Sequence, residues 1–212
     1  AVKICLQTVD QEVRQGVGAL SMAMTGSTPV AVNEQGTALA LLESFSENPN
    51  AMFILWKDHT AIREAAEINA LGKKDNRGYL KYVGGIYSSE WYWAKLLHVL
   101  REDPAIRAAC YTWVEHSVWM PFLLTGGNDA SQIKRNVCAA GHKALWSPVF
   151  DGLPDTDFFS AIDPMLGIYA ERFGDRVYTA VESAGYLCQE WAERLGLSTA
   201  VQIGIGSIDA HV

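Results

Sequence analysis

An aspartate near the end of the sequence lies just after two closely spaced glycines, in the string GIGSIDAH (residues 204–211). The string overlaps an apolar run, residues 200–205, that predicts a buried strand. Asp209 is therefore expected at the carboxyl end of a strand, where open α/β sheets bind their ligands. The glycines would let a substrate approach the backbone, and the carboxylate could accept a proton from a hydroxyl. Because glycine, serine and aspartate also form ordinary turns, the motif alone leaves both interpretations open.

A second candidate, Trp56, ends another apolar run, residues 51–56, that also predicts a strand. Most tryptophans pack in a core, but strand ends in α/β sheets face ligand crevices. An indole ring there offers a flat apolar wall and one N–H donor. Lys143, in the string AGHKALW, is on local grounds a solvated surface charge.

The elements that must position these residues alternate between helix and strand patterns. Apolar periodicity, capping residues and turn signals predict the following segments: a helix over 2–14, a strand over 17–24, a hairpin over 29–42 that turns at 33–36, a strand over 51–56, a helix from Asp58 or Thr60 to 71, a helix over 89–101 that Pro104 ends, and a helix over 188–195 before the strand 200–205. This alternation indicates an α/β domain with some parallel strands.

Composition excludes several classes of protein. Of the 212 residues 49% are apolar, enough for one sizeable core, and the formal net charge is −7. An acidic chain without a Lys/Arg cluster argues against nucleic acid or an anionic membrane as partner. No apolar run is long enough to span a bilayer, and the four scattered cysteines indicate reduced thiols, so a cytoplasmic protein is expected. Neither cysteines nor histidines show metal-ligand spacing; any metal is expected to arrive with a nucleotide.

Five longer strings carry a family resemblance: TGSTPV (25–30), NPNAMFILWKDHTA (48–61), YVGGIYSSEWYWAKLLHVLREDP (82–104), CAAGHKALW (138–146) and LCQEWAERLGL (187–197). In this order and at these separations they resemble the ribulokinase family of FGGY carbohydrate kinases, over essentially all 212 residues. The resemblance implies a ribonuclease-H-like lobe of the actin and hexokinase type. It also implies that ATP, with Mg²⁺, binds in the cleft between two such lobes of the complete enzyme.

The resemblance also implies roles for single residues. Asp209 matches the catalytic aspartate, which would accept the proton of the 5-hydroxyl of a pentulose, ribulose. Lys143 matches a sugar-contacting lysine, and Gly26 occupies the place of a small substrate-contacting residue beside Trp56. One position departs from the family pattern: Ala23 stands where an acid is usual, which puts sugar affinity in doubt more than reaction class.

The resemblance predicts that residues 1–212 are part of the N-terminal, sugar-binding lobe, incomplete at both ends. The acidic phosphate loop that opens this lobe in the family and the C-terminal nucleotide-binding lobe are not in the sequence, so these 212 residues alone are expected to be inactive. Two alternatives remain open: a non-catalytic sugar-binding module, and a kinase for another pentulose. The sequence does not decide between these alternatives, and either is compatible with a homo-oligomer.

Overall fold

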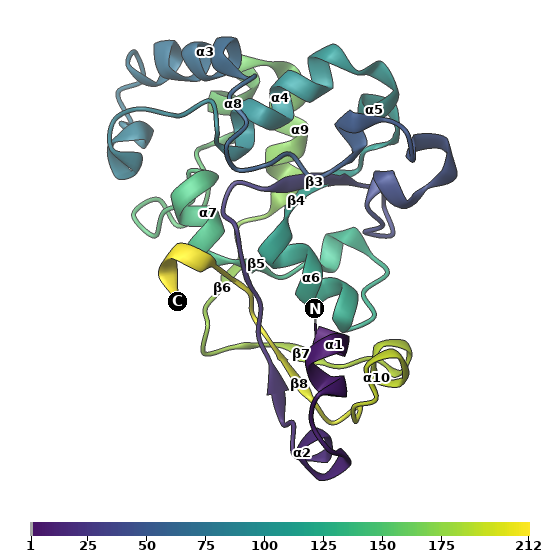
Figure 1. Cartoon of the computed structure of the whole chain (residues 1–212). Coiled ribbons are helices and arrows are strands. Elements are labelled where there is room, and N and C mark those ends of the chain that lie inside the picture. The colour runs from purple at the N-terminus through teal and green to yellow at the C-terminus, as the bar shows by residue number, and fades with distance from the viewer. Residues whose placement is uncertain (1) are drawn as a thin grey trace.

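The computed structural model describes residues 2–212 as a mixed α/β structure (Figure 1). A central antiparallel pair, β3 (Pro29–Val32) and β4 (Thr112–Glu115), is buried along its whole length. Several helices lie on one side of this pair: α3 (Ile62–Gly72), α4 (Tyr92–Glu102), α5 (Pro104–Ala109), α8 (Thr156–Ile162) and α9 (Pro164–Phe173). The largest hydrophobic core lies between them and includes Trp93, Trp113 and Phe159, all fully buried.

On the other side of β3 and β4 the chain forms short parallel strands. β1 (Ala19–Leu20) pairs with β8 (Gln202–Gly204), and β2 (Ala23–Met24) pairs with β9 (Ser207–Ile208). The antiparallel strand β7 (Ser183–Tyr186) extends the first pair into a sheet of order β1-β8-β7. Helices α1 (Val2–Gln7), α2 (Gln11–Gln15), α6 (His116–Leu124) and α10 (Gln189–Leu195) surround these strands, which join an N-terminal segment to a C-terminal one (Figure 1).

A third parallel pair joins β5 (Arg135–Asn136) to β6 (Val177–Tyr178). Asn136 is also the N-cap of α7 (Val137–Lys143), where its side chain accepts a hydrogen bond from the amide of Ala139. Short 3₁₀ turns complete the structure: η1 (Leu39–Leu41), η2 (Glu43–Phe45), η3 (Pro49–Ala51), η4 (Tyr79–Val83), η5 (Ala130–Gln132) and η6 (Asp209–His211).

Parallel strands and alternating helices confirm the predicted α/β class, but several predicted boundaries are wrong. The helix over 2–14 is two helices, because Asp10 caps the second of them through the amide of Val13. The strand over 17–24 is divided at residues 21–22 into β1 and β2. Pro104 does end one helix, yet it also occupies the first turn of the next, where a proline costs no hydrogen bond.

The predicted hairpin over 29–42 and the predicted strand over 51–56 do not form. Val32 makes only an isolated bridge to Ala38, and β3 instead pairs with β4, about eighty residues further along the sequence. Residues 51–56 run beside β3 with a hydrogen bond from the amide of Ile54 to the carbonyl of Pro29, but they form no ladder. Within this run Phe53 and Ile54 pack against two different cores, whereas Met52, Leu55 and Trp56 are exposed.

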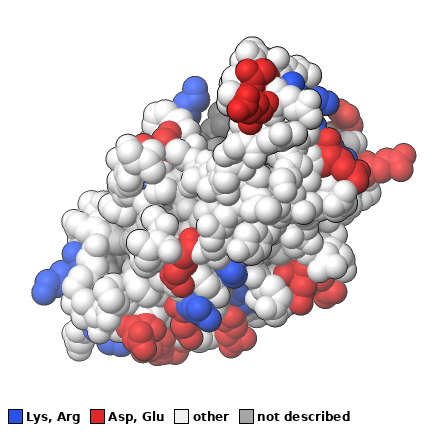
Figure 2. All heavy atoms as spheres, turned by 90° about the horizontal axis from the view of Figure 1, so that it is seen from below, with Lys and Arg blue, Asp and Glu red and all other residues white. Residues whose placement is uncertain are grey.

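Charges are scattered over the face seen from below in Figure 2, where Lys and Arg form separate groups at the margin around a broad uncharged surface. All four cysteines are free thiols, of which Cys110 is buried. Among residues 2–212 no helix combines the length and the apolar character needed to cross a membrane.

Candidate functional site

The pairing of β2 with β9 brings two distant segments to one edge. The strands are parallel, with Ala23 opposite Ser207 and Met24 opposite Ile208. The Thr25–Thr28 turn and Asp209 therefore leave the pair at the same, carboxyl end. The sequence predicted Asp209 at the end of the strand over 200–205; in the structure that strand stops at Gly204, and Asp209 follows the next short strand instead.

A cavity of about 340 Å³ opens at this edge. Its lining consists of Thr25, Gly26, Trp56, Lys143, Ile208, Asp209 and Ala210. The four residues singled out in the sequence, which are separated by up to 183 positions, thus line one cavity. They come from a turn, an irregular segment, the end of a helix and a 3₁₀ turn.

Asp209 begins η6 and is exposed. One carboxylate oxygen, Oδ1, accepts a hydrogen bond of 2.9 Å from the amide of Ala210. A carboxylate has two oxygens with about four acceptor sites. The turn role and a role as proton acceptor are therefore compatible in this residue.

Lys143 is the last residue of α7 and is half-buried. Its Nζ lies 5.2 Å from the centre of the Trp91 ring, a distance at which the cation and the ring attract each other. The start of α7 is fixed by Asn136, whose amide donates a 2.9 Å hydrogen bond to the buried Ser117 hydroxyl. The ammonium group is thus held between an aromatic ring and the cavity.

His142, the neighbour of Lys143, points elsewhere. Its ring centre lies 4.4 Å from that of His211. Partial burial, and then the charges of His211 and Lys143, lower the pKa of His142. His142 is not among the residues that line the cavity.

The walls of the cavity differ in character. Trp56 is 51% exposed, so its ring faces the cavity and solvent rather than a core. Gly26 has no room for a side chain, because a Cβ atom there would lie 2.8 Å from Ile208 Cγ2. The glycine therefore lets the turn pack directly against the residue before Asp209. Ala23 lies at the start of this edge, on β2, and is exposed.

Sequence reasoning missed two charged residues behind the cavity, Lys95 and Glu115. Both are buried, at 1% and 5% exposure. Burial lowers the pKa of Lys95 to about 8, although attraction to Glu115, Asp58 and Glu90 acts in the opposite direction. Burial also raises the pKa of Glu115 to about 7. A signal was present, because Lys95 lies four residues after Trp91 on the face of the helix that the apolar spacing turns inward.

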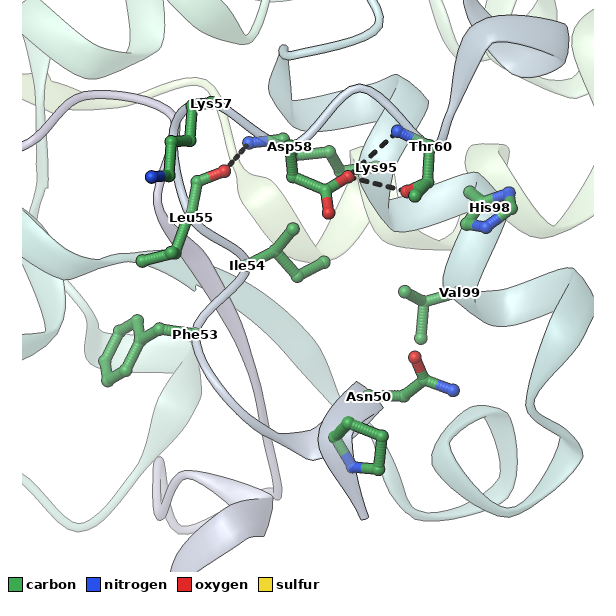
Figure 3. Close-up of a pocket in the computed structure, with 11 residues that line it drawn as sticks. Asn50, Phe53, Ile54, Leu55, Lys57, Asp58, Thr60, Lys95, His98 and Val99 are labelled. Carbon is green, nitrogen blue, oxygen red and sulfur yellow. Dashed lines mark hydrogen bonds between the residues drawn. The ribbon is translucent and has the colours of Figure 1, made fainter.

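A larger hollow, of about 500 Å³, lies beside residues 53–60 (Figure 3). Asn50, Lys57, Asp58, Thr60, Lys95 and His98 line it together with apolar side chains, and Asp58 accepts two hydrogen bonds from Thr60. Neither Asp209 nor Lys143 reaches it. Within residues 2–212 no group of three metal-ligating side chains is arranged to hold an ion, so these residues do not fit a metal site of their own.

Comparison with known proteins identifies relatives along the whole chain. The chain is 43% identical over 213 aligned residues to a ribulokinase of Vibrio parahaemolyticus, and 33% identical over 194 residues to a ribulokinase of Bacillus licheniformis. These alignments cover 100% and 91% of the chain but only 38% and 34% of the relatives. No family model matches the chain.

Solved structures show the same fold. A xylulose kinase from Rhodospirillum rubrum superposes with a TM-score of 0.74 at 18% identity, and one from Lactobacillus acidophilus with a TM-score of 0.69 at 13% identity. Each superposition covers 99% of the chain and 38% or 37% of the kinase. The actin and hexokinase type of fold is thereby confirmed. The chain belongs to the FGGY carbohydrate kinase family and is similar along its length to ribulokinases, and it spans a little over a third of the length of the relatives that it matches.

Proposed function

We propose that the protein is an ATP-dependent kinase for a pentulose, and that it transfers a phosphoryl group to the 5-hydroxyl of L-ribulose. The observation that carries this proposal is the cavity at the ends of β2 and β9, where Gly26, Trp56, Lys143 and Asp209 meet in a chain 43% identical to a named ribulokinase. Ribulose is favoured because all of the curated relatives named above are ribulokinases.

Each residue has a distinct part in this proposal. The free acceptor sites of Asp209 take the proton of the sugar hydroxyl as phosphoryl transfer begins. Lys143 donates hydrogen bonds to sugar oxygens, while the exposed indole of Trp56 covers the C–H face of the sugar. Gly26 keeps the opposite wall close to Ile208. When bound, ATP would supply the phosphoryl group and Mg²⁺ would neutralise part of its charge.

The test is Asp209→Asn in the protein as its gene encodes it, with ATP and L-ribulose as substrates. The asparagine side chain can still accept the hydrogen bond from the amide of Ala210 but cannot act as a base, so kcat should fall by about 10² to 10⁴-fold with a smaller change in sugar affinity. Asp129→Asn is the matched control, because Asp129 also accepts an amide hydrogen bond at the start of a 3₁₀ turn and lies outside the cavity. Near-normal turnover of the Asp209 variant would make Asp209 a turn residue only.

Two other functions remain distinguishable by experiment. The solved structures named above are xylulose kinases, which keeps another pentulose under consideration; comparison of kcat/KM for L-ribulose, D-ribulose and D-xylulose decides between them. A non-catalytic sugar-binding module would bind a pentulose in calorimetry yet release no ADP in a coupled assay. Sugar-dependent ADP release excludes the module.

A further inference from the structure

The buried lysine behind the cavity connects two of its walls. Lys95 lies on α4, and its Nζ donates hydrogen bonds of 2.7 Å to the carbonyl oxygens of Ser27 and Leu55. Ser27 follows Gly26, and Leu55 precedes Trp56. One ammonium group therefore ties together the backbones of both cavity walls, which are separated by some thirty residues in sequence.

The turn that Lys95 holds is strained. Ser27 has a φ of +59°, in the left-handed region that is unfavourable for a residue other than glycine. Such a conformation persists only where surrounding contacts impose it, and it is typical of functional sites. Here the contacts lie on each side of the strained residue: Lys95 binds its carbonyl, while Glu115 Oε2 accepts a 2.9 Å hydrogen bond from the amide of Thr28.

Burying the ammonium group of Lys95 has a large desolvation cost. Lys95 is 1% exposed, and two hydrogen bonds to carbonyl groups do not compensate an ammonium group for the hydration that it loses on burial. Glu115, which is also buried, attracts Lys95 when it is ionised, but its second oxygen, Oε1, finds no hydrogen-bond partner within residues 2–212. An apolar side chain at position 95 would avoid this cost, yet it could not fix the two carbonyls.

We propose that Lys95 is a positioning residue for the sugar cavity: it fixes the backbone at Ser27 and Leu55 and so sets the distance between Gly26 and Trp56. This inference rests on the proposed function for the identity of the ligand. The position of the two walls is a property of the protein without substrate. It can therefore be tested separately from sugar binding.

The experiment compares Lys95→Met with Lys57→Met in the protein as its gene encodes it. Methionine keeps much of the apolar stem and removes the donor, and Lys57 is an exposed lysine in the same wall segment (Figure 3). Hydrogen exchange, read by mass spectrometry without substrate, should accelerate at least tenfold in peptides that cover residues 25–30 and 53–58. The KM for L-ribulose should rise at least tenfold while kcat falls less than threefold and the KM for ATP stays within twofold. Lys57→Met should leave all of these unchanged.

Unchanged exchange in both wall peptides would overturn the proposal, whatever the kinetics. Faster exchange with an unchanged sugar KM would overturn it as well, because Lys95 would then stabilise the fold without setting the cavity. If Lys95→Met does not fold, Lys95→Met combined with Glu115→Gln removes the uncompensated carboxylate while leaving an acceptor for the amide of Thr28, and the same readouts apply. A wild-type protein without sugar turnover would refute the proposed function, whereas the exchange result would still decide whether Lys95 fixes the walls.

Discussion

Gly206 lies where the chain passes from β8 to β9, and replacing it with alanine should displace the edge that carries Asp209. A Cβ atom at this position would lie 1.9 Å from the carbonyl oxygen of Ser117 and 2.9 Å from its carbonyl carbon. Real Cβ atoms essentially never approach closer than 3.0 Å, so the two backbones must separate by at least about 1.1 Å. Both contacts are backbone atoms at a buried position, and no side chain can rotate away to relieve them.

Two effects follow from that displacement. Overpacking a well-packed interior costs typically 1–3 kcal/mol, and the rigid contact places Gly206→Ala near the upper end, at about 3 kcal/mol of the free energy of unfolding. Asp209 is only three residues further on, and Ser207 donates its amide hydrogen bond to the carbonyl of Met22. A shift of about 1 Å in a catalytic group can cost roughly 10²-fold in rate, so turnover of the folded variant should fall by that order.

Gly204→Ala is the matched control for this test. A Cβ atom there would meet the Ser21 hydroxyl at 3.1 Å, and Ser21 is exposed and able to move by a few tenths of an ångström. Neither glycine has a positive φ, so neither substitution forces alanine into a left-handed backbone conformation. Urea unfolding gives the stabilities, and coupled ADP release gives the turnover. If Gly206→Ala were as stable and as active as Gly204→Ala, the close packing of β9 against Ser117 would not position Asp209.

Two further predictions concern the charges around the cavity. Lys143→Met should weaken sugar binding by about 1.5 to 3 kcal/mol in calorimetry, with ATP affinity unchanged. Lys81→Met is the control for loss of the contact between an ammonium group and an aromatic ring, which both substitutions remove. An equal effect of the two substitutions would mean that Lys143 is an ordinary surface charge. Burial raises the pKa of Glu115 from 4.5 to about 7, so between these pH values the folded state retains a proton that the unfolded chain releases. The stability that this carboxyl group contributes is therefore fully present below pH 4.5 and is lost as the pH rises through 7. The stability of the wild type relative to Glu115→Gln should therefore decline between pH 5 and pH 7.5, by on the order of 3 kcal/mol, and urea unfolding curves that differ by the same amount at both pH values would contradict the assigned burial.

The sequence by itself was enough to predict the α/β class and the candidate cavity residues. Asp209 and Gly26 lie in short strings whose glycines and polar residues mark turns at strand ends, which is local information. Lys143 was found through the family resemblance, since nothing local distinguishes a ligand-binding lysine from an ordinary one, whereas Trp56 was singled out because it ends an apolar run. Helix α4 was predicted to within three residues at its N-terminal end because its apolar periodicity is strong.

Only the tertiary structure decided which strands pair and what lies behind the cavity. The run over 51–56 is apolar enough for a strand, but strand formation requires a ladder of hydrogen bonds to a partner, and beside β3 this run makes the hydrogen bond from the amide of Ile54 to the carbonyl of Pro29 without forming a ladder. The parallel pairing of β2 with β9 joins residues more than 180 positions apart, a contact that no local pattern encodes. The same holds for Lys95, because its position in the sequence shows an inward-facing lysine, whereas its two carbonyl partners come from segments that meet only in the folded chain.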